Sequence, residues 1–329
     1  MRKFMGAALC CAAMALSGSA IADDSSAALG AGGLQFTRAA DIRMAREDLF
    51  ISPNAVRIHY EFANDANKDV DSLVAFPLPD IDLYEYAESP VGTVGNDPVN
   101  FVDFKATANG QRIPVEVEQR AFVGTRDVTA IVKAAGLPVN LLVGDGYQTL
   151  DKLPAAKKSA LEKAGIAENG GGPDQEYPKW TVRTKFYWTQ HFPAGKTIVL
   201  EHSYKPVTGQ TFFTSYDFDE KPGDDGRHWI KDTCMDGPTL AAIRAKMKLP
   251  RAGQDQGLLN IYSTDFILTT ANNWKNGIGT LHLTVDKLKP GNIMSLCWAG
   301  NLKKTGPTTF ESTLTDVQPT KDIQLVVLE

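Results

Sequence analysis

The chain has 329 residues, and at about 100 to 200 residues per domain this length predicts two domains rather than one small module. Hydrophobic residues make up 43% and charged residues 22% of the sequence, which excludes a disordered, collagen-like or membrane-embedded chain. The formal net charge of -5 argues against nucleic-acid binding, because such proteins carry a surplus of cations to meet the phosphates.

The first 22 residues have the features of a secretory signal peptide. Arg2 and Lys3 precede the apolar run 4–16, and Ala20 and Ala22 supply the small residues of a cleavage site. The run is too short to span a bilayer, which needs about 20 apolar residues. We therefore predict cleavage after Ala22 and a periplasmic or secreted mature protein without a transmembrane anchor.

After cleavage the chain keeps two cysteines, Cys234 and Cys297. An even pair of thiols in an exported protein indicates one disulfide, because the compartment is oxidising. A reactive thiol with His228 as its base is the alternative. Asp232 and Asp236 flank Cys234 and disfavour a thiolate, so the disulfide is the stronger prediction.

The mature chain begins with residues 23–33, which are small and polar and are predicted to form a flexible N-terminus. Residues 34–206 follow as the first predicted domain. Their apolar and polar side chains alternate with a period of two, which is typical of half-buried strands.

Two pairs of alternating segments in this domain predict β-hairpins. The segments 56–62 and 73–76 flank an asparagine-containing turn, and the segments 101–106 and 113–117 flank Asn109-Gly110. An antiparallel β-sandwich accounts best for both pairs.

Residues 127–176 interrupt the strand pattern. Asp127 can cap one helix and Pro154 can open another, which predicts a helical insertion. Strands are predicted to resume at 180–188 and 197–204.

Residues 207–329 are predicted to form a second β-rich domain. A short helix begins at Pro238 and ends before Pro250, and strand-like segments follow it to the end of the chain. The predicted fold class is therefore mainly β, with two antiparallel β-sandwich-like domains, a helical insertion in the first and a short helix in the second.

The five histidines have no partners at a spacing diagnostic of a metal or catalytic motif. His59 and His282 fall on the polar faces of their strands, which favours solvated surface positions. His202 shares parity with Leu200 and Tyr204 and is predicted to point toward the core. A hydrogen-bonded core histidine is favoured there over a catalyst.

Large aromatic side chains mark the segment before His202. Trp180 and Trp188 share parity on one predicted strand, and exposed rings at these positions would stack on a sugar or peptide. Core packing is favoured, because such rings prefer burial. Trp180, Trp188 and His202 are the candidate ligand-binding residues.

The loop 216–226 concentrates carboxylates. Asp217, Asp219, Asp224 and Asp225 carry the hard oxygen ligands that calcium prefers, which makes them the candidate metal ligands. Their spacing does not match a calcium-binding loop, so a solvated acidic turn is favoured, and no other cofactor is predicted.

The sequence Val74-Ala75-Phe76-Pro77-Leu78-Pro79-Asp80 follows the predicted strand 58–64. This order resembles a family of exported bacterial proteins, domain of unknown function 4424. Further segments that carry the resemblance are 117–122, 186–195, 268–274 and 304–310. The resemblance implies export and supplies no activity.

Motifs for a zinc protease, a nucleophile elbow and a phosphate-binding loop are absent from the sequence. We therefore predict a non-catalytic exported protein that binds a small ligand or another protein of the cell envelope. A hydrolase of an envelope polymer or ester is the alternative, because catalytic groups can assemble from distant positions. A structural or assembly role is the third possibility.

Overall fold

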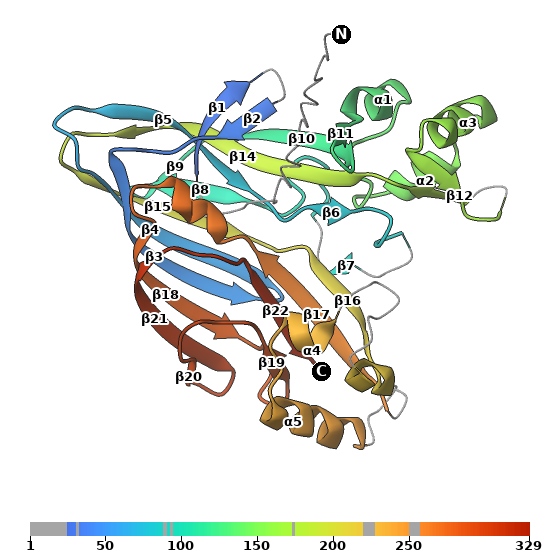
Figure 1. The fold of residues 1–329 in the computed structure, drawn as a ribbon. Coiled ribbons are helices and arrows are strands. Elements are labelled where there is room, and N and C mark those ends of the chain that lie inside the picture. The colour runs from blue at the N-terminus through green and yellow to red at the C-terminus, as the bar shows by residue number, and fades with distance from the viewer. Residues whose placement is uncertain are drawn as a thin grey trace, which may run out of the picture.

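A computed structural model describes residues 25–30, 33–87, 91–92, 95–172, 175–219, 228–249 and 257–329, so the predicted signal peptide lies outside the described residues. Within them the protein is mainly β, as predicted, with few helices (Figure 1). None of the described helices has both the length and the apolar character needed to cross a membrane.

The first large sheet has eight strands in the described part of the chain, in the order β20-β21-β18-β3-β4-β15-β8-β9. Their bounds are β3 (Ile42–Ser52), β4 (Ala55–Asn64), β8 (Lys105–Ala108), β9 (Gln111–Arg112), β15 (Thr197–Tyr204), β18 (Ile278–Asp286), β20 (Lys303–Lys304) and β21 (Thr309–Val317). Neighbouring strands are antiparallel except β3 and β18, which run parallel.

The second large sheet has seven described strands, in the order β11-β10-β14-β5-β1-β2, with β6 paired to β14. Their bounds are β1 (Ser25–Gly30), β2 (Gly33–Phe36), β5 (Val70–Pro77), β6 (Ile81–Asp82), β10 (Glu116–Val123), β11 (Arg126–Asp127) and β14 (Thr181–Phe192). In Figure 1 this sheet lies across the top of the view, above the eight-stranded sheet.

The two sheets pack face to face through aromatic side chains. Phe186 of β14 stacks on Phe104, the residue before β8, with 4.3 Å between ring centroids, and Phe192 of β14 meets Phe62 of β4 at 6.1 Å. The apolar residues of each alternating strand fill this layer, so the other face of the eight-stranded sheet carries the polar residues.

A third sheet of five described strands packs against the end of this core, in the order β19-β22-β17-β16-β7. Its strands are β7 (Val91–Gly92), β16 (Thr208–Phe213), β17 (Leu259–Phe266), β19 (Ile293–Ser295) and β22 (Ile323–Leu328). Residues 325–328 are all buried, because one face meets the shared core and the other meets α5 (Gly237–Met247) and α4 (Trp229–Asp232).

The helical insertion is confirmed. It contains α1 (Thr129–Ala134), α2 (Gly146–Asp151) and α3 (Ala155–Lys163), followed by the short pair β12 (Ala167–Asn169) and β13 (Glu176–Pro178). Figure 1 shows these helices gathered at one end of the seven-stranded sheet.

The predicted hairpin of residues 56–62 and 73–76 is wrong. These segments form β4 and β5, which belong to different sheets. The Asn64 side chain supports the crossing between the layers, because its amide donates hydrogen bonds to the carbonyls of Lys68 and Phe192. Alternation specifies which face of a strand is buried but not which strand lies beside it.

The second hairpin is confirmed at its turn. Asn109 and Gly110 have φ angles of 48° and 76°, the left-handed values that a two-residue type I′ turn requires. The predicted second arm, 113–117, is wrong: the arm is β9 at 111–112, and residues 116–117 begin β10 of the other sheet.

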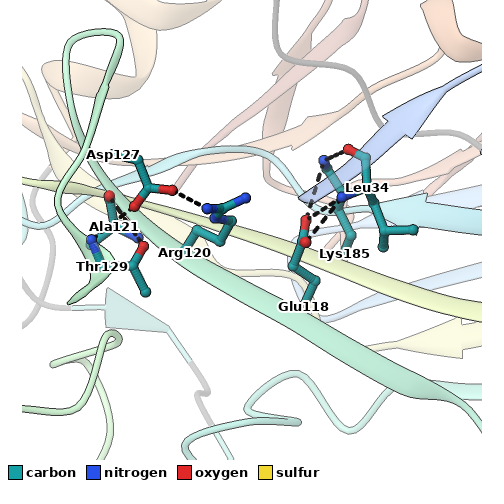
Figure 2. A network of polar contacts seen from close by, with 7 residues as sticks. All are labelled: Leu34, Glu118, Arg120, Ala121, Asp127, Thr129 and Lys185. Carbon is teal, nitrogen blue, oxygen red and sulfur yellow. Dashed lines mark hydrogen bonds and ion pairs between the residues drawn. The ribbon is translucent and has the colours of Figure 1, made fainter. Parts of the chain in front are cut away.

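The structure places the described residues of the predicted flexible N-terminus, 25–30 and 33, in strands. β1 pairs with β5 at the edge of the seven-stranded sheet, and β2 pairs with β1. Leu34 of β2 is held at both backbone polar groups: its N–H donates to Glu118 at 3.0 Å, and its carbonyl accepts from Lys185 at 2.6 Å (Figure 2). The composition of this segment does not indicate that Glu118 and Lys185 bind its backbone.

Strands and core residues from both sides of the predicted boundary after residue 206 lie together. β18, β20 and β21 from the second half complete the sheet built by β3 and β4 of the first half. One apolar core contains residues of both halves, from Ile42 to Val327.

Candidate functional site

Two of the candidate ligand-binding residues, Trp188 and His202, lie in contact across the two sheets. Their ring centroids are 5.2 Å apart and each side chain is only 3% exposed. Trp180 is fully buried, and its indole N–H donates a 2.8 Å hydrogen bond to the carbonyl of Val139 in the helical insertion. All three residues fill the core, so none of them offers a ring face to a ligand at the surface.

His202 points into the core, as its parity predicts. The rings of Tyr60, Phe76 and Phe104 also surround it, with centroid distances of 5.4, 5.4 and 5.2 Å. Burial lowers the pKa of His202 to about 3, because a low-dielectric surrounding disfavours the imidazolium. The imidazole is therefore neutral at physiological pH and acts as a core residue.

The acidic loop is described only in part. Asp217 caps its own turn, because its carboxylate accepts hydrogen bonds from the N–H and the hydroxyl of Thr214 at 2.6 and 2.9 Å. Asp219 is exposed, and Asp224 and Asp225 lie outside the described residues. Among the residues that are described, no three His, Cys, Asp or Glu side chains are placed to hold a metal ion. Calcium binding by this loop stays a prediction.

Cys234 and Cys297 form the predicted disulfide, with 5.0 Å between their Cα atoms. A hollow of about 480 Å³ lies beside it and is bordered by Asp217 and His228. Asp217 therefore borders this hollow, whereas His202 belongs to the aromatic cluster between the two large sheets.

A second hollow, of about 380 Å³, lies on the polar face of the eight-stranded sheet. Side chains from β3, β4, β15 and β18 form most of its floor, and β8 forms its rim. Its charged and hydrogen-bonding residues include Asp48, Arg57, His59, Glu201, Ser203 and His282.

A β-bulge places the β3 residues of this hollow. Ile42 and Met44 are buried before Ala45, whereas Leu49 and Ile51 are buried after it, so the apolar parity changes along the strand. The pairing with β4 shifts between Met44 and Arg46, which absorbs one residue. Asp48 consequently points to the polar face, opposite His59.

Histidines and carboxylates alternate along one line across the strands. Glu201, His59, Asp48 and His282 are direct partners in the registers of β15, β4, β3 and β18. His59 Nδ1 lies 3.6 Å from Glu201 Oε1, and His282 Nδ1 lies 3.9 Å from Asp48 Oδ1. These side chains are between 31% and 53% exposed, so a ligand can reach them.

Further partners hold this line in place. Arg46 donates hydrogen bonds of 2.9 and 3.0 Å to the two carboxylate oxygens of Asp48. The hydroxyl of Thr107 donates to Glu201 at 3.1 Å. These contacts restrict the rotamers of Asp48 and Glu201 before a ligand arrives. Binding therefore costs less side-chain entropy.

Hydroxyl groups of the described residues in this hollow are not bonded to its imidazoles. No hydroxyl group of the described residues is hydrogen-bonded to His59 or His282, although Ser203 and Thr284 lie nearby in the lining. An activated serine or threonine requires a base within hydrogen-bond reach.

Sequence reasoning placed His59 and His282 on polar strand faces and assigned them no role. Their faces are as predicted, but they share a hollow because β18 pairs in parallel with β3, which lies next to β4. Alternation within a strand does not indicate which strand, more than 200 residues away in the sequence, will pair with it.

The structure thus defines a β-sandwich protein with a polar hollow on one open face. The chain belongs to the family described as domain of unknown function (DUF4424), which matches residues 22–326. The resemblance noted in the sequence is confirmed.

Two solved structures show distant likeness. A Legionella pneumophila protein, provisionally described as nutrient binding, has a TM-score of 0.46 and 15% identity, covering 94% of this chain and 70% of its own. An M1 zinc metallopeptidase from Deinococcus radiodurans has a TM-score of 0.27 and 10% identity, covering 89% of this chain and 43% of its own. Neither likeness is close enough to bear on function. No curated protein matches the chain in sequence.

Proposed function

We propose that the protein is a non-catalytic binding protein of the cell envelope, and that the hollow on the eight-stranded sheet holds a small polar ligand. The observation that carries this proposal is the accessible line of Glu201, His59, Asp48 and His282 at the floor of the hollow. Pockets with a few convergent polar groups are the usual form of small-molecule sites.

Envelope location is supported by the signal-like leader and by the Cys234–Cys297 disulfide, because disulfides persist in oxidising compartments. The alternative role, hydrolysis of an envelope polymer or ester, has weaker support, since no hydroxyl nucleophile is bonded to either imidazole among the described residues.

The binding proposal is tested by thermal melting of the purified mature protein with millimolar amino acids, dipeptides, sugars, polyamines and phosphate esters. We expect at least one class to raise the melting temperature by several degrees, because a ligand that binds only the folded state stabilises it. Ser203→Trp fills the hollow and should abolish that shift.

Thr197→Trp is the matched control, because Thr197 lies on the same strand and face as Ser203 but outside the hollow. It should keep the ligand-induced shift. A panel without any shift, or a shift that survives Ser203→Trp, would show the proposal to be wrong. Turnover of peptidoglycan or ester substrates that His59→Ala abolishes would instead establish the hydrolase.

A further inference from the structure

The hollow contains two parallel lines of side chains with different chemistry. The first line is acidic and includes Glu201 and His59. The second lies two residues further along the same strands, where Ser203 and Arg57 are direct partners and Phe50 follows on β3. Two residues along a strand correspond to about 6.8 Å.

The second line presents a cation that is fixed in place. The guanidinium of Arg57 lies 3.7 Å from the centroid of the Phe50 ring, so the aromatic face orients its plane. No carboxylate of the described residues forms an ion pair with Arg57, whereas Lys105 at the rim is paired with Asp103 at 2.8 Å. The Arg57 donors are therefore available to an anionic group.

The first line presents one carboxylate, Glu201, that no lysine or arginine of the described residues pairs with. Glu201 and Glu61 lie 3.6 and 3.9 Å from opposite nitrogens of His59, and neither forms an ion pair with a lysine or arginine there. Asp48, by contrast, is paired with Arg46. The acidic side of the hollow is thus centred on Glu201 and suits a cationic group.

We propose that the ligand is a small zwitterion whose ammonium and carboxylate groups are about 7 Å apart, such as a dipeptide or an ω-amino acid; this proposal rests on the proposed function. A dipeptide spans about 7 Å in extended form, which matches the spacing of the two lines. Its carboxylate meets Arg57 and its ammonium meets Glu201.

The same arrangement disfavours ligands with one charge. A simple anion that reaches Arg57 also faces Glu201, and a simple cation that reaches Glu201 also faces Arg57. Discrimination of this kind comes from repulsion as well as attraction. An α-amino acid carries both charges on one carbon and cannot reach both lines.

Isothermal titration calorimetry of the mature protein tests this with glycylglycine and 5-aminopentanoate as probes. Pentylamine, pentanoate and glycine are the matched analogues that lack one charge or the separation. We expect the two zwitterions to bind and the analogues to bind at least roughly tenfold more weakly, the scale of one lost charge-assisted hydrogen bond.

Arg57→Ala and Glu201→Gln should each weaken glycylglycine binding by roughly 10- to 100-fold. Arg244→Ala is the matched control, because its guanidinium also lies over a ring, 4.0 Å from the Phe218 centroid, but on α5 outside the hollow. It should leave binding unchanged, and melting curves confirm that each variant is folded.

Equal binding of pentylamine or pentanoate, or unchanged binding by Arg57→Ala, would overturn the zwitterion proposal. A sugar or polyamine that binds wild type and is lost in Ser203→Trp, while glycylglycine does not bind, overturns the ligand class and leaves the binding function standing. Failure of every probe overturns both.

Discussion

At the scale of the residue, His202 shows how a titratable group can belong wholly to the core. Its ring lies within 5.5 Å of four aromatic rings that come from both large sheets. An imidazolium there would lose its hydration, so the core holds the neutral imidazole. The free energy of unfolding of the sandwich therefore depends on pH.

We expect His202 to make the fold less stable as the pH falls. Its pKa is about 3 in the folded state and about 6.5 in the unfolded chain, so only the unfolded state gains a proton between these values. Its stabilising contribution is complete above pH 6.5 and falls by about 4 kcal/mol by pH 3.5. Urea denaturation across this range measures the free energy of unfolding.

His202→Phe keeps an aromatic ring and removes the titrating group, so this part of the pH dependence should disappear. His191→Gln is the control, because His191 is an exposed residue of β14. If the His202→Phe protein loses stability with acid as steeply as wild type, the imidazole is not the cause.

At the scale of the element, the bulge at Ala45 lies opposite a glycine on the neighbouring strand. Gly279 of β18 lies between register partners of Met44 and Arg46, opposite the extra residue. A Cβ atom at position 279 would lie 2.6 Å from the carbonyl oxygen of Ala45. Only glycine lets β18 approach β3 here, and this approach brings His282 beside Asp48.

Gly279→Ala should therefore reduce the free energy of unfolding by about 1–3 kcal/mol, the usual cost of overpacking against a rigid backbone. Gly291→Ala is the control, because a Cβ atom there meets nothing within 4 Å. It should change stability by less than about 0.5 kcal/mol. Chemical denaturation compares the two, and an equal effect would show that the close approach does not limit this sheet.

Local chemistry made some elements predictable from sequence. The helix at Pro238 forms as α5, with the Asp236 side chain accepting a hydrogen bond from the N–H of Thr239 at 2.8 Å. The turn at Asn109 and Gly110 forms because both residues tolerate left-handed backbone. The predicted hairpin of β4 and β5 was wrong, because two strands that follow one another in the sequence can belong to different sheets.

At the scale of the whole molecule, the site depends on long-range register. Asp48 and His59 are close in sequence, but Glu201 and His282 reach them only through pairing of β15 with β4 and of β18 with β3. Composition and alternation predicted the mainly β class. The hollow itself was not predictable, because no local pattern reports which distant strands are neighbours.

Because of this topology, we expect neither half of the chain to fold without the other. β18 lies between β3 and β21, and its buried Leu281, Leu283 and Val285 belong to the core shared with the first half. A fragment that ends at residue 206 would expose the edge of β3 and the apolar surface that β18 covers.

We therefore expect fragments 23–206 and 207–329 to be unfolded or aggregated when produced separately, and to recover native structure when produced together. Far-ultraviolet circular dichroism and thermal melting distinguish these states, with the intact chain as reference. Association should restore one cooperative transition, because a single core spans the break. A cooperative melt from either fragment alone would show instead that residue 206 marks a true domain boundary, and that the shared sheet joins two units already stable by themselves.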